Sequence, residues 1–399
     1  MELRHDARTP PTDGTAVSAA TAEPTTPAGQ SAPSLTARPV GQSAPSPTTR
    51  PVDPGAGRAQ TALVDSDRAS EAADDPAAEA AGRERPRGAI DRPTVSFELF
   101  PPRNIEAAPR TWETIRALEA AQPDFVSITY GAAGRTRTTS RALVSRLLRE
   151  TSLNPIAHLT CVGTSRDEIT TIVEEFLDEG VRSFLALRGD PPAGEPGWRP
   201  HPHGVDTAAG LVELLREIEQ RRCAGSAAQA VRARVRPLSI AVAAFPRGNA
   251  ATGGTRAQDV ASLLAKQEAG ADFAITQVFY DADAYLGLVA EAREAGVTIP
   301  IIPGIIAATD PARLLRVQEL TGVPVPRDLL ELLGSTDDEL ERHRRGIRAG
   351  VDLVNGVLDG GAPGIHLYTY NQHHPALDLL EGAHLDGGAR RQADRPTRD

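Results

Sequence analysis

Eight apolar runs of seven or eight residues, separated by amphipathic stretches, constrain most strongly how this chain can fold. They lie at residues 94–100, 125–131, 156–163, 183–190, 239–246, 273–280, 299–306 and 364–371. Near-continuous apolar runs of this length are typical of strands buried on both faces, and helical patterns between such strands favour a parallel sheet. We therefore expect an α/β fold, a closed (β/α)8 TIM barrel.

The segments between these runs carry helical periodicity. We expect helices at residues 107–121, 137–150, 165–180, 207–220, 257–269, 284–295, 311–320, 326–333 and 337–358. Ser165 and Glu168 have the spacing of a capping box, which indicates a helix start. The Ala- and Arg-rich residues 221–236 are assigned to no element.

The first ninety residues have a different composition. Residues 1–89 contain no Ile, Phe, Tyr, Trp or Cys and hold 12 of the 33 prolines. So little apolar matter cannot offset the conformational entropy lost on folding, so we expect residues 1–90 to form a long disordered Pro/Ala/Thr-rich N-terminal arm. A polyproline-type ligand for a partner is the alternative. The barrel is then expected at residues 91–382, followed by a polar tail at residues 383–399.

Composition also excludes several classes of function. The net charge of −10 argues against a nucleic-acid partner, because phosphate neutralisation needs a basic surface. No apolar stretch has the length of a membrane span or the form of a signal peptide, so we expect a cytoplasmic protein without membrane contact. The two cysteines suggest neither a disulfide framework nor a metal site.

Polar residues at the ends of the apolar runs are the candidates for chemistry, because barrel enzymes build their sites where strands run out into loops. Glu98 lies between Phe97 and Leu99, where desolvation would raise its pKa into the range of a proton donor. A carboxylate paired with an arginine is the alternative. Gln277 can both donate and accept hydrogen bonds, which suits a heterocyclic ligand. His158 has no second ligand at metal spacing, so a hydrogen-bonded core histidine is more plausible than a metal site.

Two charged pairs add to these candidates. Arg188 and Asp190 flank Gly189 and point the same way, so they could bind a phosphate and a cationic reaction centre, or pair with each other. Asp259 and Lys266 stand seven residues apart on one helix face and could hold the hydroxyl and phosphate ends of a ligand. Asp259 alone could equally be a solvated charge. Lys266 is the only lysine among 43 basic residues, which suggests a need for a compact ammonium group there.

Seven ordered segments carry a resemblance to a known family. They read SFELFPPR (96–103), DFVSITYGAAGRTR (124–137), AHLTCVG (157–163), ALRGDPP (186–192), AGADFAITQVFYD (269–281), IPIIPGI (299–305) and GIHLYTYN (364–371). In this order they resemble the methylenetetrahydrofolate reductase family over about residues 91–382. The resemblance implies a flavin-binding (β/α)8 barrel that passes electrons from NADH or NADPH through FAD to 5,10-methylenetetrahydrofolate. The product would be 5-methyltetrahydrofolate, a methyl donor for methionine synthesis.

The resemblance also implies roles for individual residues. Glu98 matches the general acid that opens the folate ring, and Asp190 matches an aspartate that stabilises the resulting cation. Gln277 matches a residue that contacts folate and nicotinamide. The positions that match FAD contacts are Thr129, Tyr130, His158, Arg188, Gly189, Asp190, Asp259 and Lys266. Members of the family often assemble, so a homo-oligomer is possible.

The chain departs from the family pattern at several positions. Residues 245–247 (FPR) and 249–251 (NAA) replace the common Tyr-Pro-Glu and His-Pro-Glu, and Val317 stands where relatives have a phenylalanine that stacks on folate. Arg313 replaces a common Gln, and Gln372 replaces an Arg. These changes predict weaker folate binding, by up to about tenfold for a lost stack. Two alternatives stay open: a flavin-free barrel lyase that uses Lys266 as a Schiff base, and a degenerate barrel that acts as a non-catalytic partner in a one-carbon complex.

Overall fold

The computed structural model describes residues 92–129, 135–189, 199, 201–250 and 253–385. All of them belong to one compact unit, residues 81–399. The expected arm lies outside the described residues, as does most of the expected tail. No helix in the described part is both long and apolar enough to cross a membrane.

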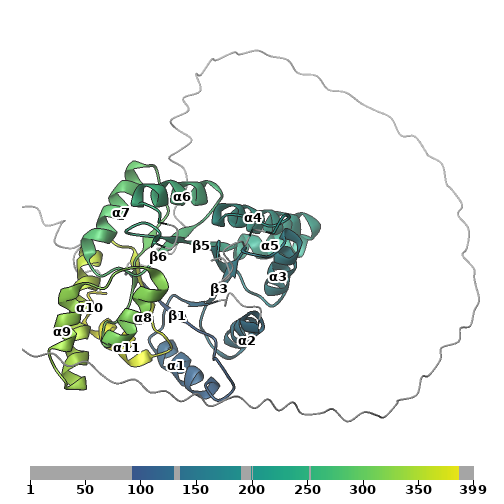
Figure 1. The fold of residues 1–399 in the computed structure, drawn as a ribbon. Helices are drawn as coiled ribbons and strands as arrows, with labels where there is room; N and C mark the ends of the chain where they lie inside the picture. Colours follow the sequence, from purple (N-terminus) through teal and green to yellow (C-terminus); the bar gives the residue numbers. More distant parts are fainter. Residues whose placement is uncertain (1–91, 130–134, 190–198, 200, 251–252, 386–399) are drawn as a thin grey trace, which may run out of the picture. The chain divides into compact units, whose positions relative to one another are not determined.

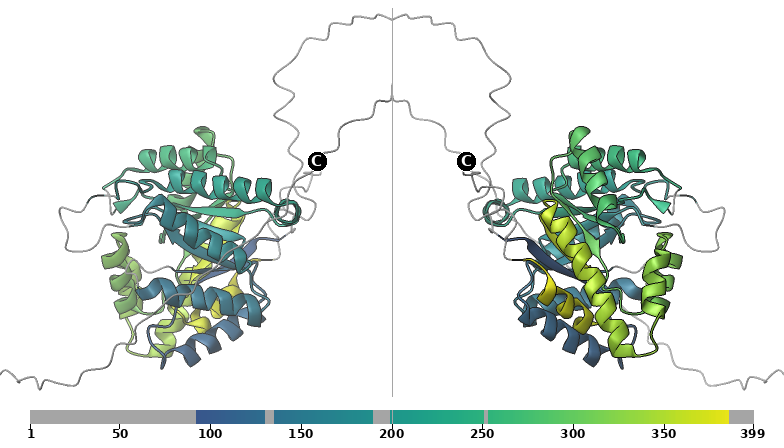
Figure 2. Two further views of the ribbon diagram at one scale, coloured as in Figure 1. Left: turned by 90° about the vertical axis from the view of Figure 1, so that its right-hand side faces the viewer. Right: turned by 90° about the vertical axis from the view of Figure 1, so that its left-hand side faces the viewer.

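Parallel strands form a nearly closed barrel with the helices outside it, which confirms the expected fold (Figures 1 and 2). The strands are β1 (Thr94–Leu99), β2 (Phe125–Ile128), β3 (Pro155–Thr160), β4 (Ser183–Leu187), β5 (Ser239–Ala244), β6 (Phe273–Thr276), β7 (Ile301–Ile302), β8 (Gly304–Ile305) and β9 (Gly364–Tyr368). Their order within the described sheet is β7-β6-β5-β4-β3-β2-β1-β9-β8.

The seventh expected strand is split into two short strands. β7 pairs with β6, whereas β8 pairs with β9, and Pro303 stands between them. Proline has no backbone N–H to donate to a ladder, which favours a break at this point. The carbonyl of Pro303 still accepts a hydrogen bond from His366 N at 2.9 Å. The eight expected strand positions are therefore present, and the seam of the barrel lies at the seventh.

The helices follow the expected pattern with small shifts at their ends. They are α1 (Ala108–Ala120), α2 (Arg135–Glu150), α3 (Arg166–Asp178), α4 (Ala208–Gly225), α5 (Ala227–Val235), α6 (Arg256–Glu268), α7 (Ala282–Glu294), α8 (Pro311–Thr321), α9 (Arg327–Gly334), α10 (Glu339–Asp359) and α11 (His373–Gly382). The capping box of Ser165 and Glu168 is confirmed at the start of α3. The unassigned residues 221–236 form the end of α4 and all of α5. Helix α11 packs against both α10 and α1, so the last helix of the described chain lies next to the first (Figure 1).

Alternation along the strands separates two packing regions. In β1, Val95, Phe97 and Leu99 belong to the large core between strands and helices. Ser96 and Glu98 occupy the alternate positions and face the inside of the barrel, because successive side chains of a strand point to opposite faces. Part of that interior is apolar, built around Ile156, Leu185, Ala241 and Ile275. The interior at β1, β2, β3 and β9 instead carries polar side chains, and this side leads to the candidate site.

Candidate active site

The barrel gathers most of the sequence-predicted site residues at the end where its strands finish. Glu98 and His158 lie near the carboxyl ends of β1 and β3. The others come directly after a strand: Thr129 after β2, Arg188 and Gly189 after β4, and Gln277 after β6. Because all strands are parallel, these ends form one rim, which we call the C-terminal rim. Tyr130 and Asp190 lie outside the described residues.

Glu98 is a buried carboxyl group next to a histidine. Its side chain is 12% exposed, and Oε2 lies 3.8 Å from His158 Nε2. Burial raises the pKa of Glu98 to about 8. No arginine of the described residues lies within ion-pair distance of it, so the arginine-paired alternative finds no partner in this part of the chain. Glu98 is therefore mainly protonated at neutral pH.

His158 faces this carboxyl group as a neutral ring. Burial lowers the pKa of His158 to about 3. Its Nε2 is buried and has no hydrogen-bond partner among the described residues, so the expectation of a hydrogen-bonded core histidine is wrong for this atom. A separation of 3.8 Å is too long for a hydrogen bond. Burial of a polar nitrogen without a hydrogen-bond partner is costly, and in a native fold such an atom commonly contacts a ligand or a bound water.

Two residues of the last strand, which the sequence reasoning missed, complete the polar side of the interior. His366 Nδ1 lies 2.9 Å from Ser96 Oγ, and burial lowers the pKa of His366 to about 3. Tyr368 donates its hydroxyl proton to Thr276 O at 2.7 Å, and its pKa is raised by burial and by the charge of Glu98. Both residues stand at alternate positions of GIHLYTYN, so the period of two in that run was the signal that they share the interior face.

Arg188 and Gly189 form the turn that follows β4 at the C-terminal rim. Arg188 is exposed, and among the described residues its side chain makes one long hydrogen bond, from Nε to Gly189 O at 3.4 Å. The pairing of Arg188 with Asp190 lies outside the described residues. An exposed guanidinium suits an anionic ligand. Gly189 has a φ of +84°, a conformation that side chains rarely adopt, and a Cβ there would lie 2.6 Å from Val162 Cγ1. Only glycine fits this turn after β4.

We expect Gly189→Ala to lower the free energy of unfolding by about 2–4 kcal/mol, because backbone strain and overpacking add. Gly163→Ala is a matched control, since Gly163 has a φ of +69° but nothing within 4 Å of an added Cβ. That control should cost only about 1–2 kcal/mol from the backbone. Urea unfolding of both variants measures the difference, and equal losses would show that the contact with Val162 does not constrain the turn.

Asp259 and Lys266 lie on one face of α6, as expected, but both are buried at 6% exposure. Asp259 Oδ2 accepts a hydrogen bond from Phe245 N at 2.7 Å, and Lys266 Nζ donates to Ala243 O at 2.8 Å. Burial raises the pKa of Asp259 and lowers that of Lys266, while each charge opposes the shift of the other. The alternative of a solvated Asp259 is wrong. Both side chains tie α6 to the end of β5, next to the rim.

Gln277 is half-buried at the end of β6. Its Oε1 accepts a hydrogen bond from Val278 N at 2.8 Å, which orients the side chain. The amide nitrogen makes no hydrogen bond to the described residues, so two N–H donors remain for a ligand.

Three of the departures from the family pattern, Val317, Arg313 and Gln372, lie on α8 and after β9. Val317 is 1% exposed in an apolar cluster with Val278, Ile306 and Leu333, so its side chain packs inside that cluster. Arg313 and Gln372 border a small cavity together with Tyr370. Arg313 NH2 lies 3.7 Å from Asp310 Oδ2, so its charge is partly compensated.

The arrangement can bind an anion, hold a heterocycle and donate a proton. Arg188 supplies the exposed cation, Gln277 the amide donors, and Glu98 the proton. Within the described ranges, no group of three or more His, Cys, Asp and Glu side chains is placed to hold a metal ion.

The similarity of this chain to known proteins extends over the whole barrel. A family model described as methylenetetrahydrofolate reductase matches residues 85–384. The 5,10-methylenetetrahydrofolate reductase of Escherichia coli (strain K12) is 32% identical over 279 residues, which are 70% of this chain and 86% of that protein. The Salmonella typhimurium enzyme of the same name shows the same identity and coverage. Methylenetetrahydrofolate reductase (NADH) 1 of Zea mays is 30% identical over 299 residues, 72% of this chain and 48% of that protein.

Proposed function

The chain belongs to the methylenetetrahydrofolate reductase family, and we propose that it reduces 5,10-methylenetetrahydrofolate to 5-methyltetrahydrofolate with electrons from NADH or NADPH passed through FAD. The observation that carries this proposal is the buried, protonated Glu98 at the end of β1. The reduction needs an acid at neutral pH, and few carboxyl groups remain protonated there.

Glu98 acts as the general acid. It donates its proton to a ring nitrogen of the folate as the carbon–nitrogen bond of the five-membered ring opens, which leaves a cationic iminium group on the substrate. Burial disfavours the carboxylate that remains, so Glu98 takes up a proton again before the next turnover. His158 stays neutral beside it and adds no positive charge that would make Glu98 more acidic.

Several residues of the rim fit the flavin. The unpaired His158 Nε2 offers a polar contact for a ring edge, and the exposed Arg188 offers a cation for phosphate. Gly189 leaves room for a close approach to the backbone. FAD, when bound, supplies the hydride. Thr129, Tyr130 and Asp190 complete the FAD contacts that the family resemblance implies.

Asp259 and Lys266 play a supporting part in this proposal. Their charged atoms are engaged by the backbone of residues 243–245, so they hold the end of β5 against the site. Gln277 binds the folate, and in the other half-reaction the nicotinamide, through its free amide N–H groups. Asp190 stabilises the cationic substrate electrostatically.

The pH dependence of folate reduction follows from Glu98. Its pKa is raised to about 8, so the proton-donating form dominates below that pH and is lost above it. We expect the rate of oxidation of the reduced enzyme by methylenetetrahydrofolate to be constant between about pH 6 and 7.5 and to fall about tenfold per pH unit above pH 8. Stopped-flow measurements across this range test it. A rate that rises through pH 8 would assign Glu98 the role of a base.

Purification tests the proposed function against its rivals. Bound oxidised flavin absorbs at about 450 nm, so the proposal predicts a yellow protein with one flavin per chain. A barrel lyase or a non-catalytic partner predicts no such band. A colourless protein that takes up no added FAD would contradict the proposal.

A further inference from the structure

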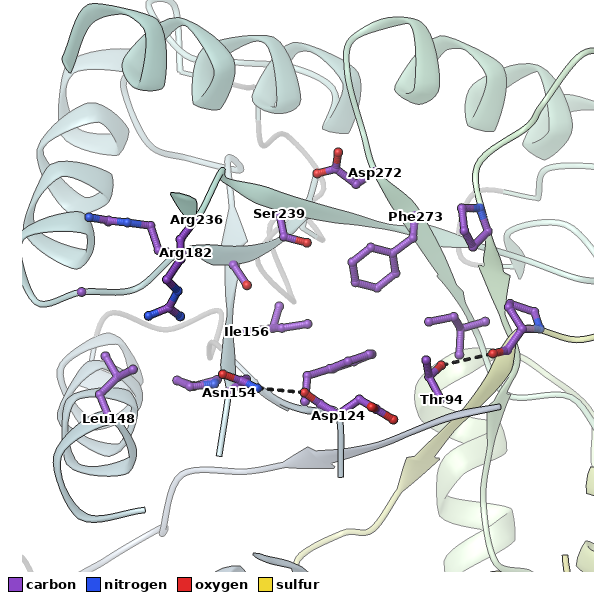
Figure 3. Close-up of a pocket in the computed structure, with 17 residues that line it drawn as sticks. Thr94, Asp124, Leu148, Asn154, Ile156, Arg182, Arg236, Ser239, Asp272 and Phe273 are labelled. Carbon is purple, nitrogen blue, oxygen red and sulfur yellow. Dashed lines mark hydrogen bonds between the residues drawn. The ribbon is translucent and has the colours of Figure 1, made fainter. Parts of the chain in front are cut away.

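A second cavity opens at the opposite end of the barrel, where the strands begin. It has a volume of about 460 Å³, which lies within the range of about 300–1,000 Å³ that is typical of small-molecule pockets. Its lining includes the first residues of β1, β2, β3, β4, β5 and β6 (Figure 3). We call it the N-terminal cavity. It shares no lining residue with the C-terminal rim.

Small side chains keep this end of the barrel open. Barrel interiors are usually filled by layers of bulky branched residues. Here β1, β4 and β5 begin with Thr94, Ser183 and Ser239, which line the cavity. Thr94 and Ser239 are labelled in Figure 3. The apolar part of the wall includes Phe125 and Phe273, whose ring centroids are 5.7 Å apart. The cavity thus presents aromatic surface that the described residues leave partly exposed.

The lining carboxylates and the lining arginines of this cavity are compensated differently. Asp124 pairs with Arg92 at 3.0 Å, and Asp272 pairs with Arg216 at 2.8 Å, although Arg216 also pairs with Glu219 at 3.0 Å. Lining residues Arg182 and Arg236, in contrast, form no ion pair with any carboxylate of the described chain. Arg182 Nη1 donates to two backbone carbonyls, those of Leu177 at 3.0 Å and Val181 at 2.8 Å, so the cavity is lined by two guanidinium groups without a carboxylate partner in the described residues.

The two arginines stand on one side of the cavity, together with two hydroxyl groups. Arg182 directly precedes Ser183, and Arg236 lies three residues before Ser239 (Figure 3). Ser183 and Ser239 are register partners in neighbouring strands, and neither hydroxyl makes a hydrogen bond within the described residues. Burial is the main cause that lowers the pKa of Arg182; the neighbouring Arg222, Arg236 and Arg232 lower it further, and Glu219 opposes the shift. Guanidinium and hydroxyl donors together suit a carboxylate, phosphate or sulfonate.

We propose that the N-terminal cavity is a binding site for a small aromatic anion, whose ring lies against Phe125 and Phe273 and whose acidic group is bound by Arg182, Arg236, Ser183 and Ser239. Apolar walls with a few convergent polar groups are the usual composition of ligand sites. The site is separate from the folate and flavin positions proposed for the C-terminal rim.

The test uses the full chain saturated with FAD and two fluorescent probes of nearly equal shape. One is 8-anilinonaphthalene-1-sulfonate, and the other is N-phenyl-1-naphthylamine, which lacks the sulfonate. Equilibrium dialysis gives the affinity and stoichiometry of each. We expect one sulfonate probe per chain, and Arg236→Gln to weaken it about tenfold or more while the affinity for the neutral probe changes less than about twofold.

Two further variants complete the test. Arg234→Gln is the matched control, since Arg234 is equally exposed on α5 but does not line the cavity, and it should leave both affinities unchanged. Ser239→Trp should fill the cavity and abolish binding of both probes. Equal sulfonate affinity in the Arg236 and Arg234 variants would overturn the proposal, as would unaltered binding in a folded Ser239→Trp variant or no binding to the wild type.

Discussion

In the Glu98→Gln variant, we expect oxidation of the reduced enzyme by methylenetetrahydrofolate to slow by about 10²- to 10⁴-fold, the usual effect of a lost general acid. An amide has no proton to give at this step. Reduction of the enzyme by NADH or NADPH needs no proton from Glu98, so its rate should change little. Stopped-flow measurement of both half-reactions separates the two effects.

Two features make this variant informative. Glutamine is nearly isosteric with glutamate, and Glu98 makes no side-chain hydrogen bond to the described residues that the amide would break. Glu106→Gln, a change of an exposed carboxylate soon after the same strand, is the control and should leave both rates unchanged. If Glu98→Gln oxidises with folate as fast as the wild type, Glu98 is not the acid.

We expect Lys266→Ala to lower the free energy of unfolding by about 2–4 kcal/mol, even without flavin. The ammonium group donates to Ala243 O, so its loss leaves a carbonyl of β5 without this donor. The loss also removes the positive charge that favours ionised Asp259. Chemical denaturation of the apoprotein measures the effect, and the flavin content of the purified variant should fall with it because the end of β5 borders the site.

Glu268→Ala is the matched control for this prediction. Glu268 lies two residues further along α6, is exposed, and makes no side-chain hydrogen bond or ion pair within the described residues. Its removal should change stability by less than about 0.5 kcal/mol. If Lys266→Ala is as stable as the control but loses its flavin, Lys266 contacts the cofactor directly and its bond to β5 contributes little.

The strand ends were predictable from the sequence because hydrophobic patterning and parallel topology act together. Residues as far apart in sequence as Glu98 and Gln277 had to lie at the same end of the barrel once eight buried runs formed one parallel sheet. The break at Pro303 was not predicted, although a proline inside an apolar run argues against one continuous central strand. Patterning also could not show the partners of Asp259 and Lys266, since a charged residue on a helix face gives no sign of whether it faces solvent or the backbone of a neighbouring strand.

The inside of the barrel was the least predictable region. Each strand contributes only two or three inward side chains, so His366 and Ser96 become neighbours through strand register, which a single sequence does not reveal. The N-terminal cavity was missed for the same reason. Ser183 and Ser239 are ordinary strand-initial residues until the barrel places them side by side.

Anaerobic reoxidation shows whether this barrel carries electrons to methylenetetrahydrofolate. The purified enzyme is reduced with NADH or NADPH until the flavin band near about 450 nm is bleached, and it is then mixed with methylenetetrahydrofolate without oxygen. We expect the band to return within the time of a turnover and one 5-methyltetrahydrofolate to form per flavin. A flavin that stays reduced in the presence of saturating methylenetetrahydrofolate would contradict it.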